Sequence, residues 1–154
     1  MRKLPTLLAI AGLSLGAGTA LAATSVATVG STSTPRLGTV LVGSNGHTLY
    51  VFSADKKNKS NCNGQCATNW PALLTSGKPK VKGSAKASEL GTIKRGSAEQ
   101  VTYDGHPLYY NVADTVSGDI SGQGTKVDGG TWTVIGPNGS PITSSGKSTT
   151  HSGY

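Results

Sequence analysis

Carboxylate side chains are scarce in this sequence of 154 residues, which holds only seven Asp and Glu against 14 Lys and Arg. No serine stands in a Gly-x-Ser-x-Gly setting, and there is no glycine-rich phosphate-binding loop. These absences exclude the nucleophile elbow of hydrolases and the P-loop of nucleotide-binding enzymes. With so few groups for acid–base or nucleophilic chemistry, we expect a protein that is not an enzyme and that carries no cofactor.

Long hydrophobic runs are also missing, apart from one near the N-terminus. Met1–Lys3 is short and basic, Leu4–Ala17 is mostly apolar, and Ala20–Ala22 fits the small-residue rule for signal-peptide cleavage. The apolar run is too short, and too rich in Gly and Ala, for a membrane span, and nothing downstream resembles one. We therefore predict a signal peptide over 1–22 and a secreted chain, extracellular or periplasmic, with no transmembrane segment.

Cysteine occurs only twice, at Cys62 and Cys66. Neither lies near the cleavage position, so the chain lacks the residue that would take a lipid anchor. Two close thiols in an exported chain predict a disulfide. The alternative is a redox or copper-type metal site, in which His47 and His106 would join the two cysteines, although no second close pair follows as in structural zinc sites.

Glycine and proline, by contrast, are abundant, with 22 and 7 residues, which predicts many turns between short strands. The Ser/Thr/Val/Ala/Gly-rich segment 23–35 carries no charge and no convincing period, so we expect a flexible lead-in. A single β domain should follow over 36–142. The polar segment 143–154 is expected to be a disordered tail.

One stretch of the sequence occurs twice, since Gly46–Asp55 returns as Gly105–Asp114. The dipeptides Asn45-Gly46 and Asp104-Gly105, at the start of the two copies, are strong signals for a two-residue hairpin turn. The unit is therefore predicted to be a hairpin used twice, in repeats at about 37–74 and 90–135.

The predicted turns also fix a register. A two-residue loop places Val42 opposite Leu49 in the first hairpin and Tyr103 opposite His106 in the second. Together with one helical turn over 65–70 and a last strand over 132–135, this predicts an all-β fold. Duplicated hairpin units should form one compact sheet or sandwich, with at most short helical turns.

The residues of these repeats are similar to a known family. Tyr50–Asp55 fits a Tyr-x-aromatic-x-x-Asp motif, Trp70-Pro71 follows the cysteine pair, and Val101–Tyr109 and Gly130–Trp132 are also similar. Over about residues 36–142 the chain resembles the bacterial secreted-repeat family, predicted lipoproteins with that motif. The resemblance implies an extracytoplasmic β domain of uncharacterised function. The chain departs from it at Asn111, which replaces the aromatic of the second motif, and in lacking the lipid-bearing cysteine.

The motif residues permit two interpretations. They could form a ligand surface, or the rings could fill the core while each aspartate closes its strand by an Asx-turn. We favour the structural interpretation, because aromatic residues at period 2 are what a packed sheet needs. The residues concerned are Tyr50, Phe52, Asp55, Tyr109 and Asp114.

A basic segment lies between the copies and is opposed only by Glu89. Such runs are usually solvated loops, but this one could hold an anionic cell-envelope polymer electrostatically, whereas specific nucleic-acid binding is not expected. The cations are Lys78, Lys80, Lys82, Lys86, Lys94 and Arg95.

Three functions follow from these features. The leading hypothesis is a secreted, non-enzymatic binding or envelope-associated module of uncharacterised ligand. The second is a small redox or metal-binding protein that uses Cys62 and Cys66, and the third is an adhesive surface protein that acts through the basic segment.

Overall fold

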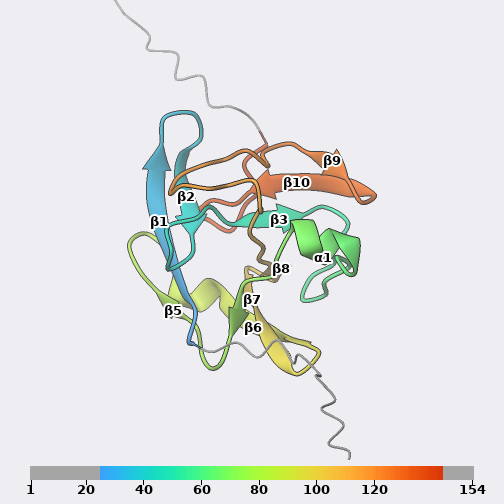
Figure 1. Cartoon of the computed structure of the whole chain (residues 1–154). Helices are drawn as coiled ribbons and strands as arrows, with labels where there is room; N and C mark the ends of the chain where they lie inside the picture. The colour runs from blue at the N-terminus through green and yellow to red at the C-terminus, as the bar shows by residue number, and fades with distance from the viewer. Residues whose placement is uncertain (1–24, 144–154) are drawn as a thin grey trace, which may run out of the picture.

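The computed structural model of the chain describes residues 25–143 (Figure 1). The predicted signal peptide and residues 144–154 of the predicted tail lie outside this part. Among the described residues, no helix combines the length and hydrophobicity needed to cross a membrane.

Short strands dominate the described residues, so the predicted all-β class is confirmed. The helical segments are one turn, at the place where a turn ended by Pro71 is predicted, and one 3₁₀ turn. In chain order the elements are β1 (Thr28–Thr34), β2 (Gly38–Val42), β3 (Tyr50–Phe52), α1 (Gln65–Asn69), β4 (Leu74–Thr75), β5 (Lys80–Val81), η1 (Ala87–Glu89), β6 (Leu90–Arg95), β7 (Ala98–Tyr103), β8 (His106–Pro107), β9 (Lys126–Val127) and β10 (Gly130–Val134).

The strands form three small sheets. Their orders are β2-β1-β5, β3-β10-β9 and β4-β7-β6, and β8 also pairs with β7. All pairings are antiparallel except that of β1 with β5. Figure 1 shows β10 alongside β3 in the upper half and the β6–β7 hairpin at the lower end.

The expected flexible lead-in over 23–35 is wrong for most of its length, because Thr28–Thr34 forms β1. This strand pairs with the whole of β2 and, in parallel, with β5. Its side chains are mainly hydroxylated and small, so no apolar period marks it. The hydroxyl of Thr34 also accepts a hydrogen bond from the Leu37 amide (3.1 Å), which helps to set the turn into β2.

The register predicted for the first hairpin is wrong by one residue. Val42 bridges Thr48 rather than Leu49, and the Leu49 amide donates to the Leu41 carbonyl (2.9 Å). Gly46 has a φ of 80°, but Asn45 is not among the described non-glycine residues with positive φ. A type I′ turn needs positive φ at both central residues, so a three-residue loop ending in a left-handed glycine forms instead.

The second hairpin has the predicted register, with Tyr103 opposite His106. Here both turn residues, Asp104 (φ 47°) and Gly105 (φ 77°), adopt the left-handed conformation of a two-residue turn. β8 ends at Pro107, whose ring nitrogen cannot donate to a ladder.

The repeats exchange their last strands. β4, from the first repeat, pairs with β7 of the second, while β10, from the second repeat, pairs with β3 of the first. Between them Tyr50 and Tyr109 bridge the repeats directly, because each amide donates to the other's carbonyl, at 2.9 and 3.0 Å. This reciprocal pattern relates the repeats by an approximate two-fold axis at the two tyrosines and makes them one folded unit.

Two clusters of buried side chains form the interior. Leu41, Leu49 and Val51 belong to one, whereas the neighbouring Val40 and Tyr50 belong to the other. Because successive strand residues point to opposite faces, the first hairpin is covered on both sides. It is therefore central in the fold, which agrees with its apolar sequence.

Aromatic rings fill the second cluster. The ring of Trp132 stacks on Trp70 at 4.0 Å and on Phe52 at 4.3 Å, and it meets Tyr109 edge-on at 5.0 Å. The two tryptophans come from the ends of the two repeats, so this stack joins the repeats a second time. Large aromatic side chains contribute most of the apolar area that a small domain can bury.

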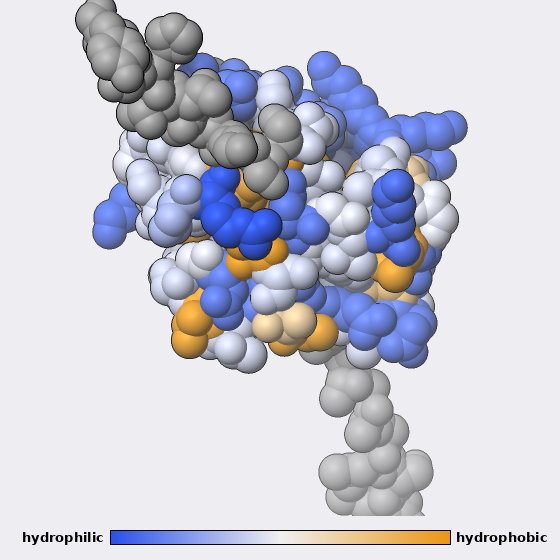
Figure 2. Space-filling model, turned by 90° about the horizontal axis from the view of Figure 1, so that it is seen from above, coloured by the Kyte–Doolittle hydropathy of each residue, from blue (hydrophilic) through white to orange (hydrophobic). Residues whose placement is uncertain are grey.

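Where described residues are visible in Figure 2, the upper face of the molecule carries no broad hydrophobic patch. Figure 2 shows its hydrophobic residues as small separate areas between hydrophilic ones. In the described part of the chain, the large hydrophobic side chains that are exposed are four valines, Val26, Val112, Val116 and Val127.

Candidate functional site

The Tyr and Asp residues of the two motifs bond across the repeats. The hydroxyl of Tyr50, from the first copy, donates to Oδ2 of Asp114 in the second copy at 2.6 Å. The hydroxyl of Tyr109, from the second copy, donates to Oδ2 of Asp55 in the first at 2.7 Å. The tyrosine and the aspartate of each motif therefore bond to the aspartate and the tyrosine of the other copy, and not to each other.

Each aspartate uses its second oxygen to hold the loop that follows it. Oδ1 of Asp55 accepts from the Asn61 amide at 2.6 Å, and Oδ1 of Asp114 accepts from the Ser121 amide at 2.9 Å. These bonds span six and seven residues, so the Asx-turns expected at the two aspartates are wrong. An Asx-turn forms instead at Asn111, whose Oδ1 accepts from the Ala113 amide at 3.1 Å.

Phe52 does not offer its ring to a ligand, because only 4% of the residue is exposed. Its counterpart in the second copy, Asn111, is also buried. The structure thus places the aromatic residues of the motif in the interior and both aspartates against tyrosine hydroxyls.

Burial shifts the titration of the motif groups. Desolvation raises the pKa of Tyr50 and of Tyr109 well above the ordinary value, and it raises the pKa of Tyr110 from 10.0 to about 12. Desolvation also raises the pKa of Asp55, although bonds from the Asn61 amide and the Tyr109 hydroxyl oppose it.

The raised tyrosine pKa values predict alkaline unfolding. A folded chain that keeps protons which the unfolded chain releases loses stability as the pH rises above the unfolded value of 10.0. We expect Tyr50, Tyr109 and Tyr110 to ionise together with unfolding rather than before it. A pH titration that records the ultraviolet absorbance of phenolate together with circular dichroism tests this. If all three tyrosines ionise near pH 10 while circular dichroism still shows the folded chain, the prediction is contradicted.

Cys62 and Cys66 form the expected disulfide, with their Cα atoms 5.3 Å apart. Both cysteines are buried in the aromatic cluster. Since each sulfur is bonded to the other, neither is free to bind a metal in this state. Among residues 25–143 no three His, Cys, Asp or Glu side chains gather as a metal site would require, so the structure does not bring His47 and His106 together with the cysteines.

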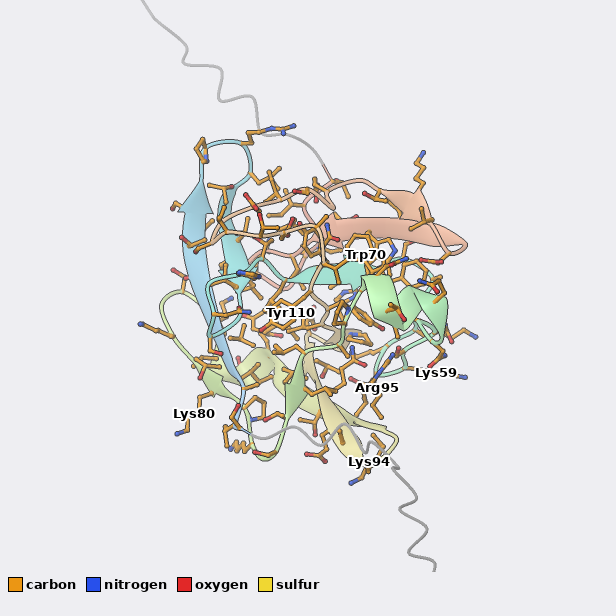
Figure 3. The ribbon with its side chains drawn as sticks, viewed as in Figure 1. Lys59, Trp70, Lys80, Lys94, Arg95 and Tyr110 are labelled. Carbon is orange, nitrogen blue, oxygen red and sulfur yellow. A yellow bond between two sulfur atoms is a disulfide. The ribbon has the colours of Figure 1, made fainter. Side chains whose placement is uncertain are left out.

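The cations of the predicted basic segment are spread over several surfaces. Lys78 and Lys82 line separate hollows. In Figure 3, Lys80 lies at the lower left of the molecule, whereas Lys94 and Arg95 lie toward the lower right. The segment is therefore not one continuous patch. Lys86 precedes η1 and is exposed.

Lys94 and Arg95 meet a further cation that the sequence prediction left out. The loop after the first motif brings Lys59 to the end of β6, on the same side of the molecule as Arg95 in Figure 3. Together these residues line a hollow of about 420 Å³, here called the basic hollow, with the polar residues that fill the gaps between them. Its lining includes Asn58, Lys59, Ser60, Asn63, Lys94 and Arg95.

Arg95 is held in this hollow by three hydrogen bonds. Nη1 donates to Oγ of Ser60 at 2.6 Å and to Oε1 of Gln100 at 3.0 Å, while Nη2 donates to the Cys62 carbonyl. Oγ of Ser60 also lies 2.7 Å from the Tyr109 hydroxyl, and because the single proton of that hydroxyl goes to Asp55, the serine is the donor in this bond. The guanidinium is thus tied to the same network as Asp55, and no further motion is needed to place its charge.

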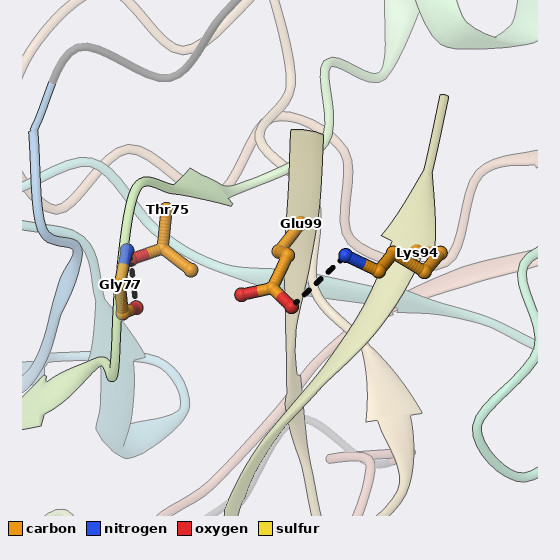
Figure 4. Close-up of polar contacts among 4 residues, drawn as sticks. All are labelled: Thr75, Gly77, Lys94 and Glu99. Carbon is orange, nitrogen blue, oxygen red and sulfur yellow. Dashed lines mark hydrogen bonds and ion pairs between the residues drawn. The ribbon is translucent and has the colours of Figure 1, made fainter. Parts of the chain in front are cut away.

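Lys94 forms the ion pair drawn in Figure 4, with Nζ 3.8 Å from Glu99. The lysine side chain is 85% exposed, and exposed pairs of this kind contribute little to stability. Lys94 and its cross-strand partner Glu99 point to the face of β6 opposite to Arg95, so Lys94 must leave this exposed pair, at small cost, to reach an anion beside Arg95. The lysines of the run Lys56–Lys59 could have indicated the part of the hollow that Lys59 lines. The sequence does not show that this run lies beside Arg95, because the two are far apart along the chain.

The disulfide supports the wall of the basic hollow, because it closes the loop that begins at Cys62 and contains Asn63. Replacing Cys62 and Cys66 by alanine is expected to lower the free energy of unfolding by about 2 kcal/mol, the entropy of so short a closed loop. Denaturant unfolding with and without reductant measures it. The reductant should lower the free energy of unfolding of the native chain and leave that of the double variant unchanged. If reduction does not change the stability of the native chain, this role of the disulfide is contradicted.

Comparison with known proteins agrees with the architecture of two repeats. The model of one family, described as a secreted repeat of unknown function, matches residues 31–74 and again 91–135. No curated protein and no solved structure matches the chain. The two matched segments cover more than half of the sequence and include both motifs with their strands. The chain therefore belongs to the family of secreted repeats of unknown function.

Proposed function

We propose that this secreted protein is a non-enzymatic module that binds an anionic polymer of the cell envelope at the basic hollow. The observation that carries the proposal is that Lys59, Lys94 and Arg95, from two distant segments, all line one depression. Clustered cations in a concave site concentrate anions and speed their capture. The secreted chain stays basic without Arg2 and Lys3 of the predicted signal peptide, since its formal net charge is then +5 against +7 for the whole sequence, and this favours the same class of partner.

The fixed position of Arg95 supports binding rather than mere solvation. A guanidinium already oriented by protein hydrogen bonds loses little entropy when an anion arrives. Lys59 and Lys94 are exposed and add charges that can adjust to the ligand. This combination of one fixed and two adaptable cations suits a flexible polymer with repeated charges.

The roles of the motif carboxylates support a non-enzymatic function. General acid–base catalysis needs a carboxyl group that can reach a substrate proton. Asp114 is buried and accepts from both Tyr50 and Ser121, and Asp55 accepts from Tyr109 and Asn61. Asp114 is therefore closed to a substrate, and the two protein hydrogen bonds of Asp55 join the repeats and hold its loop.

Linear polyphosphate, a simple polyanion, is the probe that tests the basic hollow. Replacing Lys59 and Lys94 by glutamine should weaken binding roughly ten-fold at low salt, since two charge contacts of about 0.7 kcal/mol each amount to one factor of ten. The salt dependence of the affinity should also become shallower by about one unit of slope for each lysine lost. Isothermal titration at several salt concentrations measures both quantities.

A matched control separates the hollow from net charge. Replacing Lys78 and Lys82 by glutamine removes the same charge from two exposed positions outside the basic hollow. That variant should bind polyphosphate nearly as well as the native chain. Equal weakening by both double variants would show that binding follows total charge and not this site.

A further inference from the structure

We infer that a second hollow, beside the basic hollow, takes a polyhydroxylated unit, so that the ligand is a polymer in which phosphate groups alternate with polyols or sugars. This inference rests on the proposed function and names the chemistry of its ligand. The second hollow measures about 390 Å³, and we call it the hydroxyl hollow. The lining residues that matter here are Val51, Ser53, Asp55, His106, Thr131 and Thr133.

The pairing of β3 with β10 creates this hollow. Thr133 lies opposite Val51, and Trp132 lies opposite Phe52. Since side chains alternate across a sheet, the tryptophan and phenylalanine enter the aromatic cluster while Thr133 and Thr131 point to the other face. The hydroxyl hollow is thus the reverse side of the aromatic stack, built on strands that the stack holds rigid.

The polar groups around the hydroxyl hollow suit a neutral ligand with many hydroxyls. Thr131 and Thr133 are half-buried, and each hydroxyl can donate one hydrogen bond and accept two. The imidazole of His106 adds a donor and an acceptor. In the described part of the chain, no side-chain hydrogen bond engages these three groups, so they remain available to a ligand.

The carboxylate of Asp55 disfavours an anionic ligand in the hydroxyl hollow. Each of its carboxyl oxygens accepts one protein hydrogen bond, from Asn61 and from Tyr109, which leaves acceptor capacity on both. A carboxylate attracts hydroxyl donors and repels a second anion. Pro141 also lines this hollow and is exposed, so its ring offers an apolar surface against which the CH groups of a polyol can pack, as in most small-ligand sites.

The two hollows lie on either side of one short loop. The hydroxyl of Tyr109 is 2.7 Å from Asp55, which lines the hydroxyl hollow, and 2.7 Å from Ser60, which lines the basic hollow. Two hydrogen bonds therefore separate the walls of the two sites. A polymer whose anionic and hydroxylated units follow each other closely can occupy both at once, and gains affinity from the second contact.

Two polymers and three double variants of the secreted chain test this inference. Poly(glycerol phosphate) offers both chemistries, whereas linear polyphosphate offers only the anion. Replacing Thr131 and Thr133 by valine keeps β-branched side chains on β10 and removes the hydroxyls. We expect poly(glycerol phosphate) to bind this variant about five- to ten-fold more weakly, as for one or two lost hydrogen bonds, with no change for polyphosphate.

The control is the loss of hydroxyls elsewhere, by Thr39→Val with Thr92→Val at two exposed strand positions. This variant should bind both polymers as the native chain does. Amide chemical shifts give an independent readout, because poly(glycerol phosphate) should perturb Thr131 and Thr133 and polyphosphate should not.

The outcomes separate the two proposals. Both proposals are supported by two results together. Lys59→Gln with Lys94→Gln should weaken the binding of both polymers, and the two threonine substitutions on β10 should weaken the binding of poly(glycerol phosphate) alone. If those threonine substitutions weaken neither polymer, or weaken both equally, the hydroxyl hollow is not a polyol site even though the basic hollow stands. If the lysine substitutions leave polyphosphate binding unchanged, the basic hollow fails as the anion site, and the joint ligand fails with it.

Discussion

Replacing Trp132 by alanine is expected to lower the free energy of unfolding by about 3–5 kcal/mol, the range for a large aromatic removed from a packed core. The ring lies between Trp70 and Phe52 and meets the edge of Tyr109. The residue is fully buried, so its loss leaves a cavity lined by aromatic side chains from both repeats. Denaturant unfolding followed by tryptophan fluorescence and circular dichroism measures the change.

Trp132→Phe is the matched control. It keeps a ring in the stack and removes the indole nitrogen, which is buried without a hydrogen-bond partner among the described residues. We therefore expect the phenylalanine variant to lose less than half as much stability as the alanine variant. An alanine variant that unfolds at the native denaturant concentration would show that the stack does not join the repeats.

Replacing Asp114 by alanine should cost about 2–4 kcal/mol, because it leaves buried hydrogen-bond donors without an acceptor. The Tyr50 hydroxyl loses its 2.6 Å partner, and the Ser121 amide loses its 2.9 Å partner. Asp55→Ala should cost less, since Asp55 is partly exposed and water can replace it. Thermal and denaturant unfolding of the two variants give the comparison.

A double-mutant cycle between Tyr50→Phe and Asp114→Ala isolates the bond between the repeats. The double variant should lose about 1–3 kcal/mol less than the sum of the single variants, as expected for groups in direct contact. Single effects that simply add would mean that the tyrosine and the aspartate stabilise the fold separately.

Local features of the fold could be predicted from the sequence. Asp104-Gly105 predicts its turn because both residues tolerate positive φ, and Cys62 and Cys66 are close enough along the chain to pair without knowledge of the fold. Pro71 ends the helical turn where expected. In each case the physical cause lies within a few residues of the feature.

Features that depend on distant partners could not be predicted. β1 is a strand because β2 and β5 lie beside it, although its small hydroxylated residues carry no apolar period. The first turn breaks the expected register because Asn45 does not take the left-handed conformation there. Local propensity is a weak guide where tertiary pairing decides.

The candidate site shows the same division. The repeated tyrosine and aspartate could be recognised in the sequence, but the bonding of each aspartate to the tyrosine of the other repeat follows only from the exchange of strands. Likewise, Lys59 and Arg95 meet because one lies in the loop after the first motif and the other at the end of β6. Charge counts along the sequence cannot show such a meeting.

Hydrogen exchange of the Tyr50 and Tyr109 amides tests most directly whether the repeats form one folded unit. Each amide donates to the carbonyl of the other tyrosine, so neither bond can open without separating the repeats. We predict that both amides exchange only through global unfolding, with equal opening free energies that match the value from denaturant unfolding. Exchange of either amide through a partial opening about 2 kcal/mol below that value would contradict it.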